Sequence, residues 1–219
     1  MKRMFILFSL VPALIIASTT GVSAGWPSIK DLKGDYATIE TRYCVQADDA
    51  NGSFDSGPQY PLTSTVGGNT RLAQFNGVLR LFGDGHGSWD LKGLQIFNKF
   101  SVNPGPAYPV EGVVVDCDIK YKVKPDGTIE LTSTNCVGTD TAGGSINTTY
   151  YTDTETVLIA TISADRNTML LSAVEPNVEI IRWATANGMT TRERICSRTG
   201  TAIRLHEKGH RYYTPDIED

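Results

Sequence analysis

Residues 113–134, VVVDCDIKYKVKPDGTIELTST, carry the clearest structural pattern in the chain. From Val113 to Val123 every second residue is apolar or cysteine, and the residues between them are mostly charged. A period of two is typical of a β-strand with one face buried and the other in water. Pro125-Asp126-Gly127 then predicts a tight turn, because proline fixes φ and glycine accepts a positive φ. The stretch therefore predicts a β-hairpin whose second arm is 128–134.

The same plan recurs along the chain. A glycine-rich turn at 83–87 and a polar turn at 164–167 each separate two β-rich runs. About nine strands are expected, over 36–46, 71–82, 89–97, 113–124, 128–134, 156–162, 169–174, 178–184 and 192–205. Hairpins in series favour an all-β antiparallel meander that closes into a barrel or folds into a sandwich. We expect a barrel of about 8–9 strands, with a short helical turn capped by Ser28 and loops over 47–69 and 98–108.

The first residues predict a cleavable signal peptide. Lys2 and Arg3 precede an almost wholly apolar run, 4–17, and Val22-Ser23-Ala24 is a small-x-small cleavage site. The run is shorter than the roughly 20 residues that a membrane-spanning helix needs. The predicted organisation is a signal peptide over 1–24, a single β-barrel domain over 25–205 and a polar C-terminal tail over 206–219. The mature protein is expected to be secreted or periplasmic.

The charge of the chain argues against some classes of partner. Removal of 1–24 takes away two of the 20 basic residues and none of the 24 acidic ones, which leaves a net charge of −6. An acidic chain without a basic patch argues against nucleic acid and against anionic membranes. We expect no nucleic-acid partner and no membrane association after signal cleavage. The oligomeric state stays open.

Two disulfides are predicted, because an exported chain meets an oxidising compartment and four cysteines follow the signal. The first and last strands of a closed meander are neighbours, which pairs Cys44 with Cys196. Both are expected to point outward, because arginines and a glutamate share their strand faces.

Cys117 and Cys136 lie on the two arms of the 113–134 hairpin and are predicted to pair with each other. A three-residue turn would place Cys117 opposite Asn135 and would direct Cys136 to the other face. The pairing therefore requires a four-residue loop or a β-bulge between Leu131 and Cys136.

The segment Leu32-Lys33-Gly34-Asp35-Tyr36 resembles the start of lipocalin-like (calycin) barrels, in which a helical turn precedes Gly-x-Trp on the first strand. Tyr36 stands where that family has Trp. The resemblance implies a lipocalin-like barrel in which a late basic residue, here Arg204, covers the Tyr36 ring through a cation–π contact. The chain is also similar to bacterial exported proteins with a Phe-Gly-Asp-Gly hairpin, a likeness that implies a fold and no activity. Avidin-like and allene-oxide-cyclase-like barrels fit the pattern as well.

The inward side chains of such a barrel either fill it or line a pocket for one small ligand. The expected inward set is Ile39, Tyr43, Phe75, Leu79, Leu81, Trp89, Leu91, Val115, Ile119, Tyr121, Ile129 and Leu131. The pattern does not separate a filled core from an apolar pocket. If a pocket exists, the ligand-lining candidates are Tyr43, Phe75, Trp89 and Tyr121, the ligand is a small apolar molecule, and no cofactor is expected.

The string His206-Glu207-Lys208-Gly209-His210 matches the H-E-x-x-H pattern of zinc hydrolases. That pattern needs a helix and a third ligand, whereas this string follows a β pattern and contains a glycine. We therefore expect no metal; His206 and His210 are the candidates if one binds. With three histidines in the chain, no catalytic constellation can be assigned.

Three classes of function fit these features. The first, which we favour, is an exported soluble binding module for a small apolar ligand. The second is a protein-interaction or inhibitory domain that uses a loop such as 47–69. The third is an enzyme, either an isomerase acting in the cavity or a zinc-dependent hydrolase using His206 and His210.

Overall fold

The computed structural model describes residues 25–47, 53–54, 62–63, 68–99, 110–142, 145–173, 177–185 and 188–206. In chain order its elements are the 3₁₀ helix η1 (Ile29–Leu32) and the strands β1 (Gly34–Ala47), β2 (Ser53–Phe54), β3 (Leu62–Thr63), β4 (Gly68–Leu81), β5 (His86–Lys99), β6 (Val110–Val123), β7 (Ile129–Ala142), β8 (Ser145–Thr152), β9 (Thr156–Ile162), β10 (Thr168–Ala173), β11 (Asn177–Thr185) and β12 (Gly188–Arg204). The predicted signal peptide and the tail beyond His206 lie outside these residues. No helix in the described part of the chain is long and apolar enough to cross a membrane.

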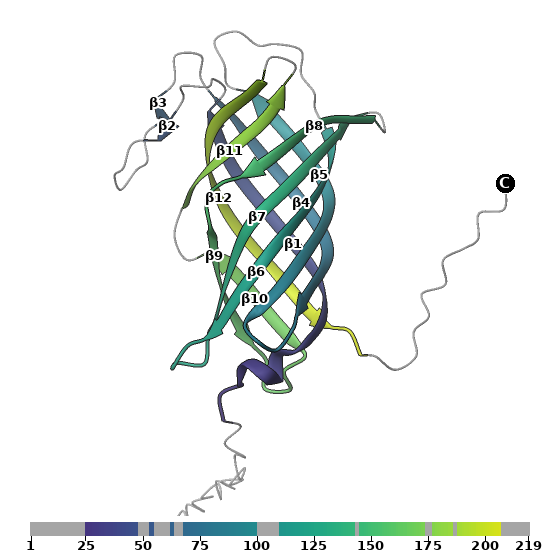
Figure 1. Ribbon diagram of the computed structural model, residues 1–219, viewed down its shortest axis with the longest axis vertical. Coiled ribbons are helices and arrows are strands. Elements are labelled where there is room, and N and C mark those ends of the chain that lie inside the picture. Colours follow the sequence, from purple (N-terminus) through teal and green to yellow (C-terminus); the bar gives the residue numbers. More distant parts are fainter. Residues whose placement is uncertain are drawn as a thin grey trace, which may run out of the picture.

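The long strands form a closed antiparallel ring in the order β1-β4-β5-β6-β7-β8-β11-β12. The ring closes where β12 pairs with β1, from Tyr36 opposite Arg204 to Gln46 opposite Arg194. Figure 1 shows the tilted strands wrapped around one barrel, with η1 at one end. We call that end the turn end, and we call the opposite end, where β1 stops at Ala47, the loop end. The predicted antiparallel meander that closes into a barrel is thus confirmed.

At two positions in the barrel wall, one strand occupies the loop end and a neighbouring strand in the sequence occupies the turn end. β7 pairs with β8 toward the loop end, from Cys136 onward, and with β9 toward the turn end, up to Ser133. β12 likewise pairs with β11 and then with β10. The wall is therefore eight strands around at both levels. The prediction of about nine strands missed β8 and also the short β2–β3 pair inside the expected loop 47–69.

Apolar side chains fill the turn end of the barrel. The predicted inward residues Phe75, Trp89 and Tyr121 are buried there, together with Leu79, Leu81, Leu91, Ile119, Ile129, Leu131, Leu158, Met169 and Leu171. The Trp89 indole Nε1 donates to Thr38 Oγ1 at 3.0 Å, so the largest core side chain is also satisfied. Each large side chain buried in this way contributes about 1.5–3 kcal/mol. This half of the barrel is a packed core.

The helix η1 covers the turn end. Ser28 and Asp31 form a capping box around it, and Leu32 is fully buried against the core. The predicted contact between the last strand and the first is present, because Arg204 Cζ lies 5.4 Å from the centroid of the Tyr36 ring. Arg204 Nη2 also donates to the Asp31 carbonyl at 2.8 Å. This arginine therefore joins both ends of the barrel sequence to one another.

The 113–134 hairpin forms as predicted, with the bulge that its disulfide requires. Lys124 N donates to Thr128 O at 2.7 Å around the three-residue turn. The register then shifts between Asp116 and Asp118, at Asn135, which adopts a φ of 51°. This extra residue returns Cys136 to the inner face, and its sulfur is 2.05 Å from that of Cys117.

The second predicted disulfide, Cys44–Cys196, joins β1 to β12 across the closing seam with an S–S distance of 2.06 Å. Its predicted direction was wrong, because both cysteines are buried inside the barrel. The side chains that alternate with Cys44 point outward: Ile39 is 58% exposed and Tyr43 is 52% exposed. Tyr43 therefore does not line the interior. Alternation identified two faces of β1, but the assumption that charged side chains face water selected the wrong one.

Candidate functional site

The loop-end half of the interior is lined by charged side chains. Glu179 of β11 lies at its centre and accepts a hydrogen bond from Arg194 Nε at 2.6 Å, a second from Arg198 Nη2, and a third from Thr156 Oγ1 at 3.1 Å. Burial alone would raise the pKa of Glu179, but the positive charges of Arg194, Arg198 and Arg42 outweigh burial and lower this pKa to about 2. Glu179 is therefore ionised at every physiological pH.

A second buried ion pair lies on β1 beside this centre. Arg42 donates from Nε and Nη2 to the two carboxylate oxygens of Glu40, at 2.8 and 3.0 Å. Arg42 Cζ lies 4.5 Å from the centroid of the Phe75 ring, and Arg198 Nη1 lies 3.9 Å from Glu40 Oε1. Burial, together with the nearby Arg42 charge, lowers the pKa of Arg198. Phe75 thus marks the boundary between the apolar core and the charged half.

Aromatic rings and guanidinium groups alternate further toward the loop end. The Tyr150 and Trp183 rings lie 4.9 Å apart between centroids. Arg194 Cζ lies 5.9 Å from the Tyr150 centroid, and Arg71 Cζ lies 5.3 Å from that of Trp183. Arg71 belongs to β4 and Trp183 to β11, so this contact spans the interior. Burial lowers the pKa of Arg71 to about 10.

Several buried polar atoms in this half have no hydrogen-bond partner among the described residues. They are Gln46 Nε2 and Oε1, Trp183 Nε1, Arg192 Nε and Arg198 Nε. Gln46 is fully buried and lies opposite Arg194, while Arg192, two residues away on β12, lies opposite Ile181 of β11. Gln46, Arg192 and Trp183 therefore occupy adjacent inward positions on three neighbouring strands. Such groups are normally matched by water or a ligand.

A buried carboxyl group lies on the other side of the same half. Gln95 Nε2 donates to Asp140 Oδ1 at 3.2 Å and to Glu111 Oε2 at 3.3 Å. Burial raises the pKa of Asp140 to about 7, although Arg71 opposes this shift. Asp140 is therefore partly protonated at neutral pH. The buried charged residues of the described chain are four arginines and three acids, so they carry a net positive charge.

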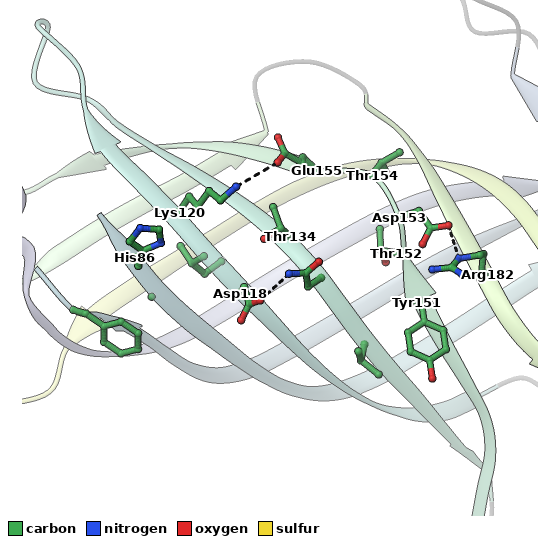
Figure 2. Close-up of a pocket in the computed structure, with 15 residues that line it drawn as sticks. His86, Asp118, Lys120, Thr134, Tyr151, Thr152, Asp153, Thr154, Glu155 and Arg182 are labelled. Carbon is green, nitrogen blue, oxygen red and sulfur yellow. Dashed lines mark hydrogen bonds and ion pairs between the residues drawn. The ribbon is translucent and has the colours of Figure 1, made fainter. Parts of the chain in front are cut away.

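A second candidate site is a groove on the outer face, about 660 Å³ in volume. It lies where β7 changes partner from β8 to β9, so that Thr134 and Asn135 have no β8 or β9 residue opposite them. Figure 2 shows His86 and Arg182 at opposite ends of this groove, with Asp118 and Thr134 between them.

Polar contacts link the side chains of the groove in pairs. Asn135 Nδ2 donates to Asp118 Oδ2 at 2.9 Å, and Arg182 Nε lies 2.5 Å from Asp153 Oδ2. Lys120 Nζ lies 3.9 Å from Glu155 Oε1 (Figure 2). Each cation of the groove therefore has an acidic neighbour within it.

The predicted site residues are dispersed by the fold. Trp89 and Tyr121 are part of the packed turn end, Phe75 lies at its boundary, and Tyr43 lies on the outer surface. His206 is exposed just after β12, and His210 lies outside the described residues. The described chain contains no group of three or more His, Cys, Asp or Glu side chains placed to hold a metal ion.

Sequence reasoning missed the charged half of the interior. Arg192, Arg194, Cys196 and Arg198 share one face of β12, and that alternation was visible in the sequence. The usable signal was the cysteine, because half-cystines are among the most buried residue types and indicate the inner face. The partner Glu179 lies on a different strand and is not identifiable from this alternation.

Comparison with known proteins adds little. No protein-family model matches this chain, and no curated protein matches it. Among solved structures, the crystal structure of Neisserial surface protein A aligns with 79% of this chain and 100% of its own, at 10% sequence identity and a TM-score of 0.34. A likeness of this degree carries no argument about function.

Proposed function

We propose that this protein is an exported β-barrel binding protein that holds a small anionic ligand in the loop-end half of its interior. The observation that carries the proposal is the set of unpartnered buried atoms on Gln46, Arg192, Trp183 and Arg198. A buried polar group that stays unpaired costs about 1–3 kcal/mol, so a ligand that pairs several of them gains affinity.

The chemistry of these atoms selects the class of ligand. Trp183 Nε1, Arg192 Nε, Arg198 Nε and Gln46 Nε2 are donors, and Gln46 Oε1 is the one acceptor among them. The surrounding buried arginines outnumber the buried acids. Both facts favour a ligand rich in acceptor oxygens, such as a carboxylate or a phosphate. The apolar ligand expected from the sequence fits this lining poorly, because the apolar half of the interior is filled.

Two further features support the proposal that the protein is exported and surrounded by water. Both disulfides favour a compartment outside the cytoplasm, as the predicted signal peptide does. The outer face of β6 favours water around that part of the barrel, because the charged residues Asp116, Asp118, Lys120 and Lys122 are exposed there. A lipocalin-like kinship stays part of this proposal.

The test compares a buried glutamine with an exposed one. Gln46→Leu removes the unpartnered amide, and Gln74→Leu makes the same change on the outer face of β4. The probes are benzoate and acetate, each paired with its neutral amide, and the readout is tryptophan fluorescence in a Trp26→Phe background, which keeps Trp183 and the core residue Trp89. We expect the anions alone to bind, with affinity reduced about tenfold by Gln46→Leu and unchanged by Gln74→Leu. Binding that ignores charge, or that survives Gln46→Leu unchanged, would refute the assignment.

One observation favours a second function, acid–base catalysis on the bound ligand. Asp140 is buried in the same half and its pKa is raised to about 7, which suits a general acid or base at neutral pH. Native mass spectrometry of protein purified from its own host would identify the ligand. Turnover of that ligand, lost in Asp140→Asn while binding persists, would establish an enzyme; unchanged ligand after incubation would exclude this function.

A further inference from the structure

We propose that the outer groove of Figure 2 is a second binding site, separate from the interior, and that its ligand is a neutral polyhydroxylated molecule such as an oligosaccharide. The proposal rests on the shape of the groove, on the balance of its donors and acceptors, and on its two exposed aromatic rings. It does not depend on any ligand inside the barrel.

The hollow is a consequence of the strand exchange in the wall. Most lining residues are on the outer face, but the lining also includes Ile119 and Thr152, which belong to the buried faces of β6 and β8. The groove is therefore deeper than the surface of a continuous sheet. Two hydrogen bonds tie the Asp153-Thr154 part of its lining to β11: Asp153 N donates to Ile180 O at 2.8 Å, and Ile180 N donates to Thr154 Oγ1 at 3.1 Å. A volume of about 660 Å³ lies within the usual range for small-molecule sites.

The polar lining selects a ligand that both donates and accepts. Each of the acidic groups Asp118, Asp153 and Glu155 lies beside one donor, which is Asn135, Arg182 and Lys120 respectively. An anion in the groove would be repelled by three carboxylates, and a cation would be repelled by Lys120 and Arg182. A hydroxyl group carries one donor and two acceptor positions, so a chain of hydroxyls can satisfy both sets without charge repulsion.

An exposed aromatic ring lies at each end of the groove. Tyr151 of β8 is 37% exposed and lies beside Arg182, whose Cζ is 5.8 Å from the ring centroid. Phe82 is 52% exposed and adjoins His86, because Phe82 N donates to His86 O at 2.9 Å. Aromatic side chains present an apolar face on which the C–H faces of a sugar ring can stack, while polar neighbours hold its hydroxyls.

The experiment titrates the mature protein with cellotetraose, chitotetraose and maltotetraose, with tetragalacturonate as the acidic comparison, by calorimetry at millimolar concentrations. Tyr151→Ala and Phe82→Ala each remove one aromatic ring of the groove. Tyr43→Ala is the matched control, because Tyr43 is an exposed tyrosine on the outer face of β1 and does not line the groove. Gln46→Leu tests independence from the interior site. Thermal unfolding of each variant identifies any that fails to fold.

We expect at least one neutral tetrasaccharide to bind, with affinity between about twofold and tenfold weaker in both Tyr151→Ala and Phe82→Ala, and unchanged in Tyr43→Ala and Gln46→Leu. Four outcomes would overturn the proposal: no neutral tetrasaccharide binds, tetragalacturonate binds in preference, the groove variants bind as well as wild type, or Tyr43→Ala weakens binding as much as they do. If one groove variant fails to fold, the other decides.

Discussion

Glu179→Gln tests the charged half of the interior most directly. The substitution keeps the size of the side chain and removes its charge, so that Arg194 and Arg198 remain buried without their main counter-ion. The pKa of Glu179 is lowered from 4.5 to about 2 in the folded protein. A pKa difference of that size corresponds to a stabilisation on the order of 3 kcal/mol. This agrees with the roughly 3–5 kcal/mol lost when one partner of a buried ion pair is removed.

The pH dependence of the free energy of unfolding tests the same ion pairs of Glu179 in a second way. Because the folded pKa of Glu179 lies below its unfolded value, the native state binds fewer protons between those two values. The stabilisation is therefore complete above pH 4.5 and is lost as the pH falls toward 2. In Glu179→Gln this component of the acid sensitivity should be absent.

The assay is urea unfolding with the disulfides intact, at pH 7 and in steps down to pH 2. The control is Glu155→Gln, because Glu155 is 63% exposed and its 3.9 Å contact with Lys120 is a surface ion pair. Such pairs contribute about 0–1 kcal/mol. If Glu179→Gln costs no more than Glu155→Gln, or keeps the wild-type loss of stability between pH 4.5 and 2, the assigned role of Glu179 is wrong.

Three further predictions concern single positions. The pKa of Asp140 is raised from 3.8 to about 7, so between these pH values the native state holds a proton that the unfolded state releases. The free energy of unfolding of the wild type should therefore fall as the pH rises from 4 to 8. Urea unfolding at pH 4 and pH 8 should show that Asp140→Asn abolishes this fall. At Gly127, which has a φ of 81°, an added Cβ would lie 1.7 Å from Trp26 Cε3, whereas at Gly188 an added Cβ would meet no atom within 4 Å. Gly127→Ala should therefore lower the midpoint of thermal unfolding more than Gly188→Ala does. Equal shifts of the two midpoints would argue against the Trp26 contact. N-terminal sequencing of exported protein should begin at Gly25, and an intact Met1 would contradict the predicted signal peptide.

The local β structure of this protein could be predicted from the sequence, because hairpins depend on contacts between residues that are close in the chain. The turns at 83–87 and 125–127 were predicted from glycines, and Gly83, Gly85 and Gly127 do adopt positive φ, although β5 already begins at His86. The pairing of Cys117 with Cys136 was predicted from their places on the two arms of one hairpin, and the residue count showed that it required a four-residue loop or a bulge between Leu131 and Cys136; the structure has the bulge, at Asn135. Closure of the meander paired Cys44 with Cys196, since the first and last strands of a ring must meet.

Which face of β1 and β12 lies inside at the loop end depends on contacts between distant strands and could not be predicted from either strand. A period of two defines two faces and does not orient them, and charged residues are placed outside by default because burial of an unpaired charge is costly. Here Glu179 on β11 and Glu40 on β1 neutralise arginines from β1 and β12, so the charged face is buried and Ile39 and Tyr43 are left outside. That neutralisation joins residues up to 158 positions apart in the chain, from Glu40 to Arg198. The outer groove has the same kind of origin, because β7 exchanges β8 for β9 through pairings that no single segment encodes.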